Sequence, residues 1–432
     1  MNDILNLWSQ WLRPSAGLAA VHWAILLALA SIAGYLCQRH MGMPKVVGYS
    51  LVGALAGFLG FSGVQWPLQG AVLFLVELGA SVVLFECGGR ITLRWFRHNP
   101  MVLVQSILES ALSFTAVYLL LRLIQLDAKI AAPLAIIAMA SSPVLLRRVA
   151  EDMHAAGPVT DRAMVLATLS TLYMLTLGSA QAQSVARPEA SLLGTLASIM
   201  VVLGVSAAMA VLLGLLMRLS LRIMSPTSEN TSILMLALIA ATTAVSSHLG
   251  GSAPLSALLG GLLLKHLHPR PWAWPRQMGT ASTLLTMLMF VLVSGVAATA
   301  SWGGTVVLAV LALVGARLLA KTVGVTLGNL GSGTSWRQSI WVACAMTPMS
   351  AVALLITSQY VLAMPQAGPL IAGIALPVIL LLELAGSAVA TWALHRAGEG
   401  AGWREIRHET GTPSQTAPAP LMPDTSEDRH AA

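Results

Sequence analysis

The sequence predicts an all-α membrane protein with about thirteen transmembrane helices, and three observations carry this prediction. Hydrophobic residues make up 56% of the 432 residues and charged residues only 9%, with a mean hydropathy of +0.78. A water-exposed globular surface does not tolerate such a composition. Apolar windows of roughly 20 residues, enough to cross a bilayer, follow one another along the chain. The third observation is that Lys and Arg gather in every second connection between these windows.

The apolar windows set the order and the bounds of the expected helices, which short loops join. The windows at 44–61 and 252–267 are brief and rich in glycine, so a re-entrant or unwound segment is an alternative to a full helix at either place. The expected spans are 18–38, 44–61, 68–88, 101–124, 131–150, 162–183, 191–221, 232–249, 252–267, 279–300, 303–328, 337–362 and 368–394.

The positive charges predict the orientation of the chain, because short cytoplasmic loops retain Lys and Arg. The connections that lie between the basic ones, together with the N-terminal segment, carry only Arg13, Arg122, Lys129 and Arg187. With thirteen spans, this pattern places the N-terminus outside and the C-terminus in the cytoplasm. The net charge of +7 therefore reflects topology, and no nucleic-acid partner is expected. The basic connections and the tail contain Arg39, Lys45, Arg90, Arg94, Arg97, Arg147, Arg148, Arg162, Arg218, Arg222, Lys265, Arg270, Arg276, Arg337, Arg396, Arg404, Arg407 and Arg429.

The two ends of the chain are expected to lie outside the membrane domain of residues 18–394. Residues 1–17 form a short N-terminal segment that lacks a basic n-region and a small-residue cleavage site, so the first span is expected to be retained. Residues 395–432 are polar and rich in Pro, Thr, Glu and Ala without helical periodicity. This composition is typical of a disordered cytoplasmic tail.

Two of the apolar windows are interrupted in their middle by proline and hydroxyl residues. A proline removes a helical hydrogen bond, and nearby hydroxyls can satisfy the backbone groups that it frees. Either proline alone would indicate an ordinary kink, but the two windows are seven spans apart and so run in opposite directions. The pair predicts an inverted repeat with a solute site at the midplane of a transporter. The interrupted stretches are "AMASSPVLL", with Ser141, Ser142 and Pro143, and "AMTPMSAVA", with Thr347, Pro348 and Ser350.

Few charged residues lie inside the expected spans, where each must face protein or a water-filled cavity. Arg317 and Lys321 are four residues apart and share one helix face. They are expected to neutralise the carbonyl ends of the broken helices or, alternatively, to bind an anion. Glu383 lies in the span after the second break. It is expected to be either an ion carrier or the ion-pair partner of Arg317 or Lys321.

The other acidic residues in spans are expected to be structural. Glu77 and Glu86 are nine residues apart and point to opposite faces of one helix, so they cannot form a carboxylate pair. Glu86 is expected near the cytoplasmic boundary beside Arg90, and Glu109 in a polar contact between helices. The chain shows no Ser/His/Asp set, metal cluster or phosphate loop, so neither an enzyme nor a cofactor is expected.

Six stretches in order along residues 18–394 carry a family resemblance. They are "GMPKVVGYSLVGALAG", "LVELGASVVLFECGGRITLR", "MASSPVLLRRVAED", "APLSALLGGLLL", "MFVLVSGVAA" and "GARLLAKTVGVTLG". Together they resemble the monovalent cation:proton antiporter-2 family, bacterial relatives of the sodium/hydrogen exchangers. The last stretch is similar to the helix that carries a functionally important membrane lysine in the family, which by position is Lys321.

The resemblance implies a transporter that exchanges Na⁺ or K⁺ for protons by alternating access, without a cofactor. It implies a core domain of six helices, including two crossed broken helices, that moves against a dimerisation domain. A homodimer in the bacterial inner membrane is implied as well. The first repeat is expected at about 44–183 and the second at about 252–394.

The chain departs from the family at the ion site. The helix after the first break carries one or two acids in the family, and these positions fall here on about Thr171 and Leu172. Thr171 and Tyr173 offer hydroxyls for coordination, but hydroxyls do not titrate in the working range. Exchange needs a group that is anionic with the cation bound and neutral with the proton bound. Glu383 is therefore the expected substitute carrier. The alternatives are an anion or organic-solute carrier on the same fold and a transport-deficient membrane scaffold.

Overall fold

The computed structural model describes residues 17–400 except for short gaps, and the regular elements in these residues are helical. The gaps are 62–63, 65, 94–95, 97–98, 187–191, 226–227, 269–275, 301, 330–334 and 350. The helices are α2 (Gly17–Leu36), the π-helix η1 (Cys37–Met41), α3 (Lys45–Phe58), α4 (Gly70–Gly88), α6 (Met101–Leu123), α7 (Ala128–Met139), α8 (Pro143–Asp152), α9 (Pro158–Val185), α10 (Leu192–Ile223), α11 (Glu229–His248), α12 (Ala253–Leu267), α13 (Arg276–Ala298), α14 (Gly304–Leu327), α15 (Trp336–Ala345), α16 (Val352–Ala363) and α17 (Gly368–Arg396). The predicted all-α membrane class is confirmed.

The helices fall on the predicted windows to within a few residues. Ten helical segments are long and apolar enough to cross a membrane, and α7 with α8 counts as one of them. The shorter apolar helices α3, α12 and α16 occupy remaining windows. The windows at 44–61 and 252–267 form continuous helices of 14 and 15 residues, so the alternative of unwound segments there is wrong. The count of thirteen spans remains a prediction.

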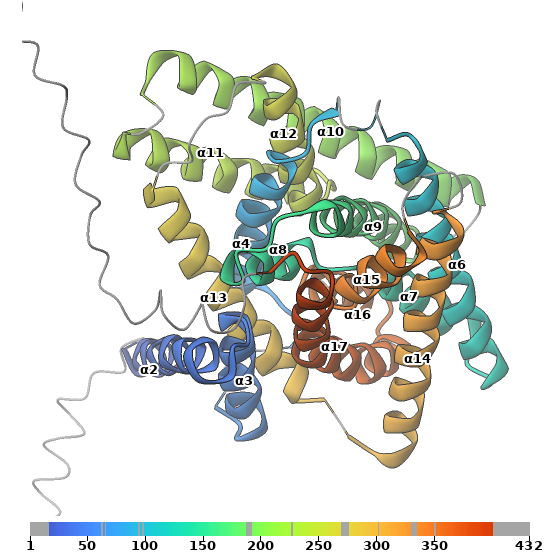
Figure 1. Cartoon of the computed structure of the whole chain (residues 1–432). Coiled ribbons are helices and arrows are strands. Elements are labelled where there is room, and N and C mark those ends of the chain that lie inside the picture. The colour runs from blue at the N-terminus through green and yellow to red at the C-terminus, as the bar shows by residue number, and fades with distance from the viewer. Residues whose placement is uncertain are drawn as a thin grey trace, which may run out of the picture.

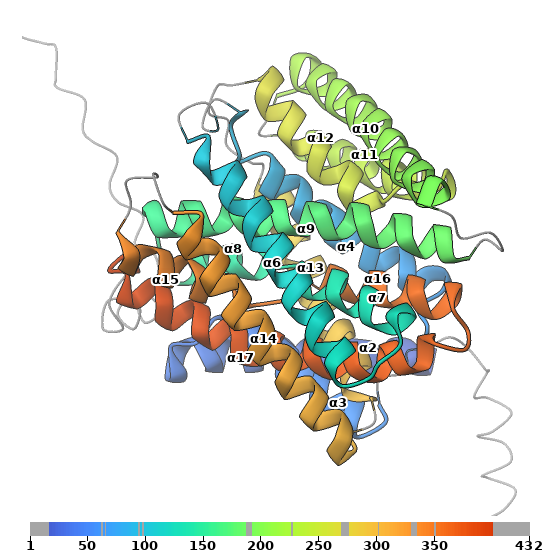
Figure 2. The ribbon, with the colours of Figure 1, turned by 90° about the vertical axis from the view of Figure 1, so that its right-hand side faces the viewer.

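The helices pack into two groups, which Figures 1 and 2 show from two directions. The core group consists of α6, α7, α8, α9, α14, α15, α16 and α17. The flanking group consists of α2, α3, α4, α11, α12 and α13, and α10 contacts both this group and α9. The helices pack more extensively within each group than between the groups. The arrangement therefore consists of two packed bodies with one interface between them.

Glycine allows the closest helix contacts of the flanking group. A Cβ atom at Gly53 of α3 would lie 2.4 Å from the carbonyl oxygen of Val291 in α13. A Cβ at Gly261 of α12 would lie 2.1 Å from the carbonyl oxygen of Phe85 in α4. Only glycine lets these backbones approach so closely, as is common between membrane helices. The pairs α3–α13 and α4–α12 thus hold the flanking group together.

The connections rich in Lys and Arg meet on one face, named here the basic face after Lys45 and Arg90. The backbone N–H of Lys45 donates to a carboxylate oxygen of Asp152 at 2.9 Å, which joins the start of α3 to the end of α8. On the opposite face, the side-chain amide of Gln183 donates to the carbonyl of Gly250 at 2.8 Å. These contacts agree with the predicted alternation for the connections that they join.

The chain turns back onto the basic face after α17. The carboxylate of Glu399 accepts hydrogen bonds from the backbone N–H groups of Val159 and Thr160, both at 2.7 Å. Glu399 therefore caps the start of α9, where a negative charge is favourable. The predicted tail consequently begins with an ordered contact, and its residues 401–432 lie outside the described residues, as do residues 1–16.

Candidate functional site

The two broken helices contact each other directly in the buried centre of the core group. The backbone N–H of Ser142 donates to the carbonyl of Pro348 at 2.9 Å. The hydroxyl of Ser141 donates to the carbonyl of Met346 at 2.9 Å. Both serines are buried. The prediction that the two interruptions lie together is therefore confirmed.

The first break has a clear local cause. Pro143 is the first residue of α8, a position where its missing N–H has no helical partner to lose. Ser142 is the N-cap, and its hydroxyl accepts a hydrogen bond from the N–H of Leu145 at 3.1 Å. The proline and the two hydroxyls thus end α7 and start α8 without leaving these groups unsatisfied.

Helix α9 binds the first break through hydroxyl groups. Thr171 donates to the carbonyl of Ser141 at 2.5 Å, and the N–H of Ser141 donates to the hydroxyl of Ser170 at 3.2 Å. The position expected to be acidic in the family therefore does lie at the break, with a threonine in place of the acid. Tyr173 lies elsewhere, because its hydroxyl shares a hydrogen bond of 2.9 Å with Ser106 of α6.

Arg317 of α14 binds the exposed carbonyl groups of both breaks. Its guanidinium donates to the carbonyls of Ala138 at 2.9 Å, Ala140 at 2.6 Å and Thr347 at 2.8 Å. These carbonyls belong to the end of α7 and to the second break, where helical partners are missing. Ser350, also predicted to line the site, lies outside the described residues.

Lys321 lies one turn further along α14 and completes the same neutralisation. Its ammonium donates to the carbonyl of Met139 at 2.9 Å and forms an ion pair with Glu109 of α6. Both charged side chains are almost fully buried. The expected neutralising role of Arg317 and Lys321 therefore agrees with the geometry, and the expected helix contact of Glu109 is an ion pair.

Glu383 is buried at the interface between the two groups of helices. It belongs to α17 of the core group, and its Oε1 accepts hydrogen bonds from Ser50 of α3 at 2.6 Å and from Ser294 of α13 at 3.1 Å. Its Oε2 has no hydrogen-bond partner among the described residues. The alternative of an ion pair with Arg317 or Lys321 is wrong, because Lys321 is paired with Glu109 and the contacts of Glu383 are serines.

Helix α17 also packs directly on the second break. A Cβ atom at Gly386, one turn after Glu383, would lie 2.8 Å from the Cα of Pro348. Glu383 therefore lies within one helical turn of the point where α17 meets the breaks. Its carboxylate joins α17, which packs on the second break, to α3 and α13 of the flanking group.

The two groups of helices are joined on the basic face by charged side chains. Arg147 of α8 forms a buried ion pair with Glu86 of α4, and its Nε donates to Glu151 at 2.8 Å. Arg148 donates to Thr286 of α13 at 3.1 Å. Glu86 was expected near the boundary beside Arg90; it lies in the last turn of α4, and its ion-pair partner is Arg147. Arg90 instead pairs with Glu151 at 3.2 Å, because the half-helix α8 brings Arg147 inward onto α4.

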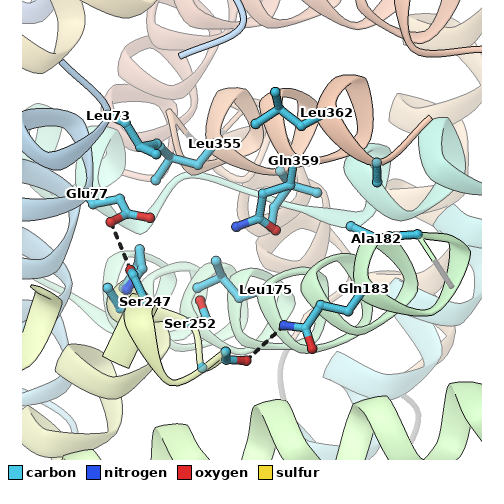
Figure 3. A pocket seen from close by; sticks show the side chains of 17 residues that line it. Leu73, Glu77, Leu175, Ala182, Gln183, Ser247, Ser252, Leu355, Gln359 and Leu362 are labelled. Atoms are coloured by element: carbon cyan, nitrogen blue, oxygen red, sulfur yellow. Dashed lines mark hydrogen bonds between the residues drawn. The ribbon is translucent and has the colours of Figure 1, made fainter. Parts of the chain in front are cut away.

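On the opposite face the two groups are separated by a cavity of about 440 Å³. Its lining comes from α4, α9, α16 and the α11–α12 connection, and includes Glu77, Gln183, Ser247 and Gln359 (Figure 3). Glu77 and Glu86 have different partners, as their opposite helix faces predicted. The interface is thus hollow beside Glu77, whereas on the basic face ion pairs join the two groups next to a second cavity of about 660 Å³ between Arg90, α8 and α9.

Several residues at the site were missed because a single sequence does not show which residues on different helices contact each other. Ser50 and Ser294, which bind Glu383, are single hydroxyls within apolar windows. Ser170 next to Thr171 is another. The available signal is that a hydroxyl in a membrane span needs a hydrogen-bond partner. This marks these serines as candidates, but it does not show which partner each of them binds.

Comparisons with known proteins agree with this architecture. The family described as "Sodium/hydrogen exchanger, transmembrane" matches residues 26–395 of the chain. No curated protein matches the chain in sequence. The structure of the sodium proton antiporter MjNhaP1 from Methanocaldococcus jannaschii at pH 8 is similar, with a TM-score of 0.68 and 15% identity over 88% of this chain and 98% of that chain. An electron-microscopy structure of the same antiporter gives a TM-score of 0.65 and 14% identity over 90% of this chain and 100% of that chain.

Proposed function

The chain belongs to the sodium/hydrogen exchanger family, and from this premise we propose that it exchanges Na⁺ or K⁺ for protons by alternating access, with Glu383 as the carrier. The family consists of cation:proton antiporters of the membrane, so a transporter and not an enzyme is the general class. The proposal adds which group binds the two ligands in a chain where Thr171 and Leu172 replace the expected acids.

The observation that carries the proposal is the surroundings of Glu383. This carboxylate is almost completely buried, and its described hydrogen-bond partners are two neutral hydroxyls. An ionised carboxylate in such a place is costly without a counter-charge. A monovalent cation or a proton can supply that charge, and the two compete for the same oxygen atoms. Competition for one site is the minimum requirement for coupled exchange.

The position of Glu383 between the two groups supports alternating access. The carboxylate moves with α17 and the broken helices, whereas Ser50 and Ser294 belong to the flanking group. A displacement of the core group would change the ligands around the carboxylate and the face to which it opens. Arg317 and Lys321 would move with it and keep the carbonyls of the breaks neutralised throughout.

The finer architecture forms part of the same proposal. The first repeat comprises about residues 44–183 and the second about 252–394, so α3 corresponds to α12, α4 to α13, and α9 to α17. The close pairs α3–α13 and α4–α12 exchange under this correspondence, which supports it. The protein is proposed to be a homodimer in a bacterial inner membrane, with its basic face in the cytoplasm.

The anion-carrier alternative is less well supported by the geometry. Arg317 and Lys321 are the charges that would attract an anion, but their donors already bind four backbone carbonyls and Glu109. Little positive charge is left for a solute. The scaffold alternative predicts no ion flux at all, and a transport assay addresses it directly.

The test is an exchange assay with purified protein in liposomes that hold a pH gradient reported by a fluorescent dye. Addition of Na⁺ or K⁺ is expected to collapse the gradient for the wild type, and Glu383→Gln is expected to abolish the response. Glu383→Asp keeps the charge and should retain part of it. Glu229→Gln, at an exposed carboxylate, is the matched control and should behave as wild type. Absence of any alkali-cation response in the wild type, or full activity of Glu383→Gln, would refute the proposal.

A further inference from the structure

We infer that the cavity on the opposite face holds a second cation site, centred on Glu77 and separate from Glu383. Its role, which rests on the proposed exchange, is to load cations from that face. The binding itself does not depend on Glu383 being the carrier. The inference comes from the charge, the ligand atoms and the size of the cavity.

The first step is the charge inside the cavity. Glu77 is almost completely buried, and Figure 3 shows its carboxylate directed into the hollow. Its Oε2 accepts one hydrogen bond, from Ser247 of α11 at 2.9 Å. No Lys, Arg or His is among the described residues that line the cavity. The cavity therefore carries one carboxylate and no basic group to balance it.

The second step is the kind of ligand atoms around the carboxylate. Gln183 and Gln359 line the cavity from the core group, and Ser247 and Ser252 line it from the flanking group. The amide nitrogen of Gln183 donates to the carbonyl of Gly250, and its amide oxygen is a further potential ligand atom. Carboxylate, amide and hydroxyl oxygens are the ligands that hard cations prefer. An alkali cation fits this set better than an anion.

The third step is the volume. One water molecule takes roughly 30 Å³ of liquid, so an alkali ion with six waters needs roughly 200 Å³. The cavity of about 440 Å³ holds such an ion together with its first hydration shell. Because the ion keeps its waters, the site is expected to attract alkali cations with little discrimination. Selection then remains with the dehydrated environment of Glu383.

The fourth step is the place of this site in the interface. Glu77 and Ser247 both belong to the flanking group, whereas Glu383 belongs to the core group and binds other helices. Glu77 and Ser247 therefore stay at the opposite face when the core group, with Gln183 and Gln359, moves. A fixed negative charge at that mouth raises the local cation concentration. This is the physical basis of the loading role.

The binding test uses alkali-cation-dependent thermal stability of purified protein in detergent, with N-methylglucamine replacing Na⁺ or K⁺ at constant ionic strength. Glu383→Gln is expected to retain a saturable upward shift of Tm on addition of the cation. The double variant Glu77→Gln with Glu383→Gln is expected to lose that shift. An equal shift in both variants would overturn the inference, whether or not the wild type transports. Should the double variant fail to fold, Gln359→Leu in the Glu383→Gln background is the alternative, because it keeps the Glu77–Ser247 contact. It is expected to raise the half-saturating concentration of the alkali cation several-fold. An unchanged half-saturating concentration would count equally against the site.

The loading role is tested by sidedness in liposomes of known protein orientation. Glu77→Gln is expected to raise the KM for the cation presented to the cavity face by roughly tenfold, as for the loss of about 1.4 kcal/mol of binding. The KM from the basic face and the maximal rate should stay the same, and Glu77→Asp should restore most of the difference. Equal changes from both faces, or no change from the cavity face, would refute the loading role.

Discussion

The ion pair between Glu86 and Arg147 is expected to hold α4 and α8 together and so to keep the basic face closed. The pair is buried and joins α4 of the flanking group to α8 of the core group. Glu86→Gln removes the charge and nearly keeps the shape. We expect this change to favour arrangements in which α8 leaves α4 and the basic face opens.

The size of the effect follows from the surroundings of Arg147. Removing one partner of a buried ion pair costs about 3–5 kcal/mol, because the other charge stays buried without compensation. Arg147 keeps a second carboxylate, since its Nε donates to Glu151 at 2.8 Å. Glu151 is about one-third exposed, so it offsets only part of the loss. We take about 2 kcal/mol as the remainder, which corresponds to a roughly 30-fold change in the ratio of closed to open forms.

A native cysteine reports this opening. Cys87 follows Glu86 in α4, is 1% exposed, and has the guanidinium of Arg147 beside its thiol. With Cys37 and Cys344 replaced by serine, a membrane-impermeant maleimide applied to the basic face should label Cys87 faster in Glu86→Gln. The rate of labelling is expected to rise with the population of the open form, by a factor that approaches roughly 30.

The matched control removes an exposed pair on the same face. Arg90 lies 3.2 Å from Glu151 with half of its side chain exposed, and such surface pairs contribute at most about 1 kcal/mol. Arg90→Gln should therefore change the labelling of Cys87 only slightly. Equal labelling of Glu86→Gln and wild type, while both remain folded and active, would show that this pair does not hold the basic face closed.

Three further predictions concern the packing around the breaks and between the helices. Glu109→Gln should lower stability in detergent by about 3–5 kcal/mol because it leaves Lys321 unpaired. Glu109→Leu together with Lys321→Met should instead be neutral or stabilising by about 1–4 kcal/mol. Similar losses of stability in both variants would contradict this account. Thr171→Val should cost about 1 kcal/mol for the lost hydrogen bond and leave the pH profile of exchange unchanged, since the threonine does not titrate; a shifted profile would speak against Glu383 as the carrier. Gly261→Ala should reduce the yield of folded protein because its Cβ would meet a backbone carbonyl, while Gly373→Ala, with open space around it, should not; equal yields in size-exclusion chromatography would refute the close-contact argument.

The sequence was sufficient for the helices and for the two breaks, because both depend on local chemistry. Apolar windows of bilayer length can form only helices in lipid, so their order and bounds could be predicted. Pro143 and Pro348 interrupt such windows whatever surrounds them. That the two breaks meet followed from their antiparallel directions, and the contact between Ser142 and Pro348 confirms it.

The partners of the buried charges could not be predicted in the same way. Helical periodicity tells which face a residue occupies, but not which helix that face meets. Glu383 was therefore equally compatible with Arg317 or Lys321 as with the serines of α3 and α13. The ion pair of Glu86 with Arg147 could not be predicted for the same reason, since the inward reach of Arg147 depends on how α8 packs. The cavity at Glu77 is a property of the interface between the two groups and has no local signal.

The proposed relocation of the carrier acid from α9 to α17 is physically reasonable because both helices pack against the breaks. Thr171 contacts the first break through its hydroxyl, and Gly386 brings α17 against the second within one turn of Glu383. In the proposed repeat these two helices correspond, so each of them places a side chain beside one of the two breaks. What changes is the set of ligands across the interface, which for Glu383 comprises the hydroxyls of Ser50 and Ser294. Removing both hydroxyls, by Ser50→Ala with Ser294→Ala, should therefore alter the preference between Na⁺ and K⁺ and leave proton coupling in place, and a loss of coupling with unchanged preference would place the carrier elsewhere.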